Sequence, residues 1–391
     1  MDIRQFIFPF IMAVITNSLM IVIIYFLRKI PLFANLFSVG FMVVLYLFCL
    51  LRIFVPIEFP GIQVIIEDGT LYTWVMESLV VHSADHSAGS PSIAAYIVLG
   101  VWTAGILAFG IHAVFSQQRF KNYLLANGDY ASDSERRLFS DIAKDILKSD
   151  KNVTLRKTDA VKGTLVIGLI HKTVLIPDGS YSDDELKMIF RHECIHIKNK
   201  DLWIKLLVQI YCCIFWWNPF AYLLKADLDF SLEMRCDLNA VRYLTDAERL
   251  VYAETLVNHS RNEKRKRIPF VVSAGFADSE KKDKLLVRIQ KLLSDPPNKA
   301  KQIIANSFVA IFLLSIFVVS YIFIWQPNFR AEGPKKDNYG LVDNIVDDTN
   351  AYLVKGTDGN YLFYYSDYPP VPVTKEEMEQ GMYEDYPIYE K

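Results

Sequence analysis

Two histidines one helical turn apart are the residues of this sequence whose types and spacing most directly indicate chemistry. They lie in the run His192-Glu193-Cys194-Ile195-His196. Residues at i and i+4 of an α-helix share a face, so both imidazoles can reach one metal ion. Glu193 lies about 100° round the helix, where its carboxylate can contact a water molecule at the metal without being a ligand. The pattern predicts a Zn²⁺ site with Glu193 as general base, the arrangement that hydrolyses peptide bonds.

A catalytic zinc ion needs a third protein ligand and one open position. We expect Glu233, on a predicted helix beyond the histidines, to be that ligand. Asp237 lies one turn further on the same face and is expected to accept a hydrogen bond from the outer nitrogen of a liganding histidine. Asp229 is the alternative ligand, and Cys236 is disfavoured because a thiolate would make the zinc less acidic. A pair of surface carboxylates bound to nearby arginines is the other interpretation.

Four long apolar segments predict that the chain is threaded through a bilayer. The 391 residues are 52% apolar and 22% charged, which excludes a disordered or nucleic-acid-coating chain. A shorter run, Leu202–Trp217, is interpreted as a buried or interfacial helix, with a fifth span as the alternative. The four segments reach the length of about 20 residues that spans hydrocarbon, and they are Phe6–Leu27, Phe33–Val55, Ile93–Phe115 and Ile303–Trp325.

Charged side chains are strongly segregated along the chain. Residues 116–302 hold 32 basic and 25 acidic side chains, whereas residues 56–92 hold five acids and no lysine or arginine. Residues 327–391 hold 6 basic and 13 acidic side chains. Because cytoplasmic loops collect lysine and arginine, we expect a multi-pass protein of the plasma membrane with both termini outside.

This topology predicts four regions. Residues 1–115 form three transmembrane helices with the outer loop 56–92, and residues 116–302 form a cytoplasmic zinc peptidase domain. Residues 303–325 form the fourth transmembrane helix, and residues 326–391 form an acidic tail outside the membrane.

The cytoplasmic region reads as mixed α and β sequence. Ser132–Lys148 is an amphipathic helix, and a second helix follows the capping residue Ser182 and continues through Lys198. The β-like run Gly163–Ile170 is either an edge strand that binds an extended substrate or an internal strand. Two further β-like runs are Val153–Arg156 and Thr173–Ile176.

The tail contains a plausible β-hairpin, formed by Ala351–Val354 and Tyr361–Tyr365 around a Thr357-Asp358-Gly359-Asn360 turn. Pro369–Pro372 and the acidic end are expected to be irregular.

The combination of motifs resembles the BlaR/MecR-type membrane metallopeptidases, which are zinc peptidases of the gluzincin class. The likeness covers roughly residues 1–325 and includes four spans with an outward N-terminus. Besides the histidine motif, it is carried by Gly163, Ile176-Pro177, Asp183-Asp184-Glu185-Leu186, Asp201, Trp217-Asn218-Pro219, Glu233-Met234-Arg235-Cys236-Asp237, Gly275-Phe276 and Arg288-Ile289.

The resemblance implies an α-helical polytopic membrane protein with four transmembrane helices, a cytoplasmic α+β gluzincin domain and a short outer tail. It implies that His192, His196 and Glu233 bind Zn²⁺ and that Glu193 is the catalytic base. The oxyanion donor stays open, with Tyr252 and His259 as candidates.

The same resemblance implies a signal transducer that cleaves a dimeric winged-helix repressor in the cytoplasm, itself, or both. Self-cleavage is expected in the small residues Ser273, Ala274 and Gly275 with Phe276, and a plain loop is the alternative. The basic stretch Arg261–Arg267 is interpreted as facing solvent or lipid, so no direct nucleic-acid partner is expected. A homodimer stays open.

One departure from the family concerns the region outside the membrane. The best-known members carry a penicillin-binding sensor domain there, with an acylatable serine and lysine. Only about 65 residues follow Trp325, and the tail has a single serine, Ser366. We therefore expect no acylation by β-lactams. The rival functions are a non-proteolytic receptor with a structural zinc site and a Ste-type housekeeping membrane protease.

Overall fold

The computed structural model describes most of the chain. The described residues are 4–30, 37–54, 63–67, 93–149, 151–161, 163–265, 276–294, 298–327, 351–355, 360–365, 370–374, 377–378, 383, 386 and 388–390. They form two compact units, Met1–Asn328 and Phe329–Lys391.

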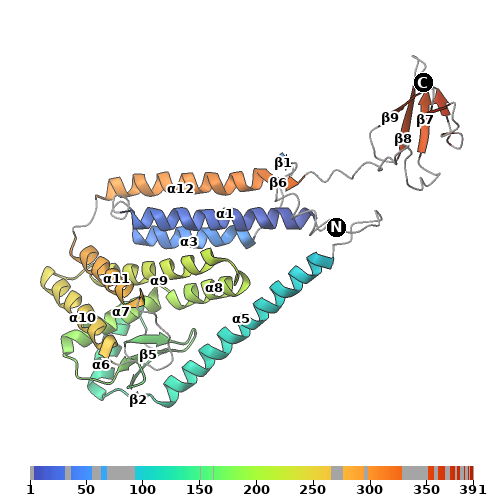
Figure 1. The fold of residues 1–391 in the computed structure, drawn as a ribbon. Coiled ribbons are helices and arrows are strands. Elements are labelled where there is room, and N and C mark those ends of the chain that lie inside the picture. The colour runs from blue at the N-terminus through green and yellow to red at the C-terminus, as the bar shows by residue number, and fades with distance from the viewer. Residues whose placement is uncertain are drawn as a thin grey trace. The chain divides into compact units, whose positions relative to one another are not determined.

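Three helices of the first unit are long and apolar enough to cross a membrane (Figure 1). They are α1 (Arg4–Lys29), α5 (Ile93–Ala126) and α12 (Lys299–Ile322). The segment predicted as the second span contains the shorter apolar helix α3 (Val39–Phe54) of 16 residues. At about 1.5 Å per residue, α3 is shorter than the hydrocarbon layer. The structure therefore supports three spans by length and leaves the fourth as a prediction.

Short strands flank two of these helices. Strand β1 (Gln63–Glu67), in the predicted outer loop, pairs in parallel with β6 (Phe323–Pro327). Consequently α12 ends at Ile322 rather than at the expected Trp325.

Helices α1 and α3 lie side by side (Figure 1) and share a hydrophobic core with two later helices, α8 (Asp201–Ile214) and α9 (Pro219–Ala240). Asn218 caps α9, and Pro219 occupies the first turn, where its missing N–H costs nothing. Helix α8, in the predicted interfacial run, has 14 residues and is too short to span hydrocarbon. Its buried residues Val208, Tyr211 and Cys212 lie in this core, whereas Trp203 and Ile210 are exposed, a pattern that agrees with the prediction of a buried or interfacial helix.

A second hydrophobic core holds the mixed α and β elements. The strands β2 (Asp129–Tyr130), β3 (Val153–Thr158), β4 (Leu165–Ile167) and β5 (Lys172–Pro177) form one sheet in the order β2-β3-β5-β4. Strand β5 runs parallel to β3 and antiparallel to β4. The three predicted strands are confirmed, and β4 lies at the edge of the sheet.

Helices α6 (Asp133–Leu147) and α7 (Asp183–Lys198) pack against each other in this core, and both begin with the capping box that the sequence predicts. Ser132 and Glu135 cap α6, and Ser182 and Glu185 cap α7. Two further helices, α10 (Asp246–Arg265) and α11 (Phe276–Leu293), complete the unit.

The second unit is a small sheet of β7 (Ala351–Lys355), β8 (Tyr361–Tyr365), β9 (Val371–Val373) and β10 (Ile388–Glu390), in the order β10-β7-β8-β9. The predicted hairpin of β7 and β8 is confirmed by its antiparallel register, whereas its turn at 356–359 lies outside the described residues. The expectation of an irregular end was wrong for the residues of β9 and β10, whereas Pro369 and most of the acidic end lie outside the described residues. Pro372 fits β9 because that strand, among the described residues, lies at the edge of the sheet and pairs only with β8.

Candidate metal centre

Helix α7 presents both motif histidines on one face. Four residues separate them, and their rings lie 4.6 Å apart between centroids in an edge arrangement. The remainder of the helix is anchored by apolar residues in the second core, among them Ile189, Phe190 and Ile197. Packing on that side leaves the histidine face turned towards α9 and α10.

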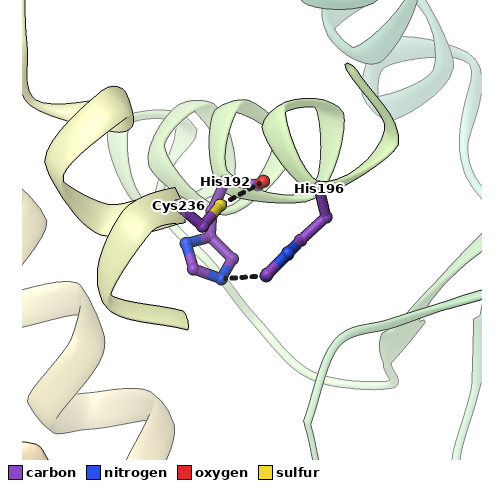
Figure 2. A group of neighbouring side chains, drawn as sticks. All are labelled: His192, His196 and Cys236. Atoms are coloured by element: carbon purple, nitrogen blue, oxygen red, sulfur yellow. Dashed lines mark hydrogen bonds between the residues drawn. The ribbon is translucent and has the colours of Figure 1, made fainter. Parts of the chain in front are cut away.

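Three side-chain atoms converge beside α7. The Nε2 atoms of His192 and His196 lie 3.0 Å apart, and Oε2 of Glu233 lies 3.6 Å from each of them. Figure 2 shows the two rings pointing their Nε2 atoms at one another. In a tetrahedral zinc site with metal–ligand bonds of about 2.0–2.1 Å, ligand atoms lie about 3.3 Å apart. The spacing of these three atoms therefore fits zinc.

The outer nitrogen of each histidine has its own polar partner. Nδ1 of His196 lies 2.7 Å from Oδ2 of Asp201. Nδ1 of His192 lies 2.8 Å from the hydroxyl of Tyr252, and that hydroxyl donates to Oδ1 of Asp237 at 2.8 Å. A proton held on each Nδ1 by these acceptors leaves each Nε2 lone pair available for a metal ion.

Asp237 is fully buried, as its predicted role requires. Its Oδ1 lies 3.3 Å from Nδ1 of His192, and Arg288 on α11 donates to both of its oxygens at 2.6 and 2.9 Å. Burial raises the pKa of Asp237, but the hydrogen bonds from His192 and Arg288 outweigh it and hold that pKa below its usual range. Asp237 is therefore an ionised acceptor behind His192.

Tyr252 does not fit the role of oxyanion donor that its position in the sequence suggested. The side chain is 1% exposed, and its hydroxyl bridges His192 and Asp237 on the side away from the Nε2 atoms. The side chain of the other candidate, His259, lies outside the described residues.

Glu233 is held on α9 between two cations. Nζ of Lys205, on α8, lies 3.5 Å from Oε1, and Nη2 of Arg288 lies 3.8 Å from Oε2. Burial raises the pKa of Glu233, but the interactions with His192 and His196 outweigh it and place that pKa well below the usual range. The rival ligand Asp229 makes no hydrogen bond or ion pair with either histidine in the part of the chain that the structure describes.

Cys236 is a second nearby group with metal-ligand chemistry. Its Sγ and nitrogens of the two histidines all lie within 4.8 Å of one another. That thiol is fully buried and donates to the backbone oxygen of His192 at 3.1 Å (Figure 2). Glu233 places one oxygen 3.6 Å from both Nε2 atoms, whereas the thiol of Cys236 donates to the backbone of α7.

Glu193 lies beside the histidines and is 5% exposed. The hydroxyl of Thr164 donates to its Oε1 at 2.6 Å. Thr164 directly precedes edge strand β4, so this bond joins the expected base to the edge of the sheet.

No sequence pattern predicted a role for Asp201, Thr164, Lys205 or Arg288. Only the resemblance singled out Asp201 and Arg288, without a function for either. An aspartate five residues after the second histidine could have been suspected, because metal-binding histidines commonly donate to carboxylates. The predicted self-cleavage residues Ser273, Ala274 and Gly275 lie outside the described residues, and Phe276 begins α11.

Comparison with known proteins places the chain in one family. A family model described as BlaR1 peptidase M56 matches residues 9–292. The methicillin resistance protein MecR1 of Staphylococcus aureus is 24% identical over 219 residues, which are 55% of this chain and 36% of that protein. The regulatory protein BlaR1 of Bacillus licheniformis is 21% identical over 213 residues, which are 54% of this chain and 35% of that protein. The chain thus spans about a third of the length of these relatives.

The family match includes most of the apolar α1, the sheet, both motif histidines, Glu233 and Arg288. It covers well over half of the chain, and the resemblance recognised in the motifs is thereby confirmed. The protein belongs to the BlaR1 peptidase M56 family.

Proposed function

We propose that this protein is a membrane-embedded zinc endopeptidase that transmits an external stimulus by cleaving a protein in the cytoplasm. The observation that carries the proposal is the convergence of His192, His196 and Glu233 beside the carboxylate of Glu193. Membership of a peptidase family supports the reaction type, and the names of the relatives, regulatory and resistance proteins, support signal transduction.

The donor set suits a resident zinc ion, because two imidazole nitrogens and one carboxylate oxygen leave the fourth position open. A zinc ion held there supplies an acidified water molecule and polarises the carbonyl of the scissile peptide bond. Glu193 accepts a proton from the attacking water and returns it to the leaving nitrogen. Thr164 fixes the rotamer of Glu193, and Asp201 and Tyr252 fix the rings of the two histidines.

Edge strand β4 supports an extended peptide as the substrate. Within the described residues it pairs only with β5, so its outer edge can bond a further strand. Because Thr164 precedes β4 and contacts Glu193, a peptide added to this edge would pass beside the base.

The expected setting is the plasma membrane, with residues 116–302 in the cytoplasm and both termini outside. The substrates we propose are a winged-helix repressor and the chain itself near residues 273–276. No direct contact with nucleic acid is proposed.

Replacing Glu193 tests the function. Membranes and cytosol from cells producing wild type or Glu193→Ala are compared by mass spectrometry of new protein N-termini. We expect zinc to be stoichiometric in both proteins and fragments to appear only with wild type. Identical fragments in both, with signalling unchanged, would favour a non-proteolytic receptor. Cleavage of many unfolded membrane proteins without a stimulus would favour a housekeeping protease.

A further inference from the structure

Helix α9 belongs to both hydrophobic cores. Leu224, Leu228 and Leu232, which lie in the first two thirds of the helix, belong to the core formed with α1 and α3. The second half of α9 places Cys236 and Ala240 in the core of α7 and the sheet. One helix therefore contacts α1 and α3 near its N-terminus and the core of α7 near its C-terminus, and Glu233 lies between these two contacts.

A buried acid fixes the first half of α9. Asp227 is 3% exposed, and its carboxylate accepts a hydrogen bond from the hydroxyl of Tyr46 on α3. The other oxygen of Asp227 forms an ion pair with Arg28, in the last turn of α1. The guanidinium of Arg28 lies 4.7 Å from the ring centroid of Phe230, one turn along α9. A single carboxylate thus joins α9 to α1 and to α3.

The buried charge of Asp227 restricts how α9 can move. A buried carboxylate is tolerated only when its partners stay within bonding distance, so α9 cannot slide or rotate without separating Asp227 from Arg28 or Tyr46. Glu233 lies six residues further on, about 9 Å along the helix axis. A small rotation of α9 at Asp227 would therefore move Oε2 of Glu233 relative to the two histidines.

We propose that Asp227, held by Arg28 and Tyr46, is a positioning residue for the metal centre. It sets the place of α9 and thereby the distance of Glu233 from His192 and His196. A displacement of α1 against α3 then changes the metal site directly. This inference rests on the proposed function, because it assigns Glu233 to the metal.

Tyr46→Phe is the sharpest test, since it removes one hydroxyl and keeps the ring. The matched control is Tyr211→Phe. Tyr211 on α8 is buried to a similar degree, and its hydroxyl accepts a hydrogen bond at 2.8 Å from Asn17 of α1 rather than from a residue of α9. Full-length proteins in lipid nanodiscs are compared by their zinc affinity in chelator competition and by their Tm. For any cleavage that yields a fragment with wild type, kcat and KM are measured as well.

We expect both variants to lower Tm, but only Tyr46→Phe to weaken zinc binding, by about tenfold, with kcat falling more than KM rises. Tyr46→Phe should have no further effect on zinc affinity in a Glu233→Ala background, because the ligand that it positions is then absent. Equal zinc affinities of Tyr46→Phe, Tyr211→Phe and wild type would overturn the proposal and leave the proposed function intact. Failure of wild type to bind zinc would instead overturn the proposed function.

Discussion

Oδ2 of Asp201 lies 2.7 Å from Nδ1 of His196, although the aspartate belongs to the helix after the one that carries the histidine. The chain makes this contact through a tight corner. Helix α7 ends at Lys198, and Lys200 adopts a left-handed conformation with φ 59° before α8 begins at Asp201. The other oxygen of Asp201 pairs with Arg235, which holds the carboxylate in place.

Asp201→Asn should weaken zinc binding by about 10- to 100-fold, because the amide no longer fixes the tautomer of His196 or raises its basicity. Chelator competition on the purified protein measures this change. Asp246→Asn is the matched control, since Asp246 is fully exposed and lies on α10. Equal zinc affinities for the two variants would contradict the role of Asp201.

Tyr252→Phe removes the hydroxyl that bridges His192 and Asp237. We expect a loss of zinc affinity of about tenfold. Asp237→Asn should lower zinc affinity more than Tyr252→Phe. In Tyr252→Phe, Oδ1 of Asp237 lies only 3.3 Å from Nδ1 of His192 and can replace the hydroxyl as acceptor. The two variants are ranked by the same chelator competition, and the reverse order would refute this arrangement.

Thr164→Val should lower kcat by about tenfold without releasing zinc, since it frees the carboxylate of the base and leaves the metal ligands untouched. The measurements are zinc content and cleavage rate on one preparation. Thr154→Val is the control, because it removes a comparable hydroxyl contact, to Thr173 at 3.1 Å, on the exposed face of the sheet. A parallel loss of zinc would indicate that Thr164 acts on the metal site instead.

Glu233→Ala and Cys236→Ala distinguish the two candidate third ligands. We expect Glu233→Ala to release most of the zinc and Cys236→Ala to retain it. Metal analysis after dialysis decides between them. Stoichiometric zinc in Glu233→Ala would assign the third position to Cys236 or to another carboxylate.

Glu135 should make stability depend on pH at the start of α6. Burial raises the pKa of Glu135, but hydrogen bonds from the Ser132 backbone and from Lys157 outweigh it and lower that pKa. A lowered pKa stabilises the fold above the unfolded-state pKa, and the stabilisation is lost as the pH falls through the folded-state value. The Tm difference between wild type and Glu135→Gln should thus be present at pH 7 and fade below about pH 4. A difference that does not change with pH would exclude this origin.

The sequence by itself determined the features that follow local rules. Helical periodicity placed His192 and His196 on one face, capping residues set the start of α7, and runs of apolar residues marked the membrane helices. Runs of β-like sequence also predicted β3, β4 and β5 of one sheet and the β7–β8 hairpin of another, but not β2, β9 or β10. Each of these signals depends on residues within a few positions of one another, which is why reading the chain in order was sufficient.

Tertiary structure alone decided which distant groups complete the site. Tyr252 was one of two candidates for the oxyanion donor and lies behind His192, and Thr164 reaches Glu193 from the edge of the sheet. Arg288 and Asp227 act across helices far apart in the sequence. Such contacts depend on how α9, α10 and α11 pack around α7. That packing is set by the shape and charge of whole surfaces, which a pattern of a few neighbouring residues does not determine.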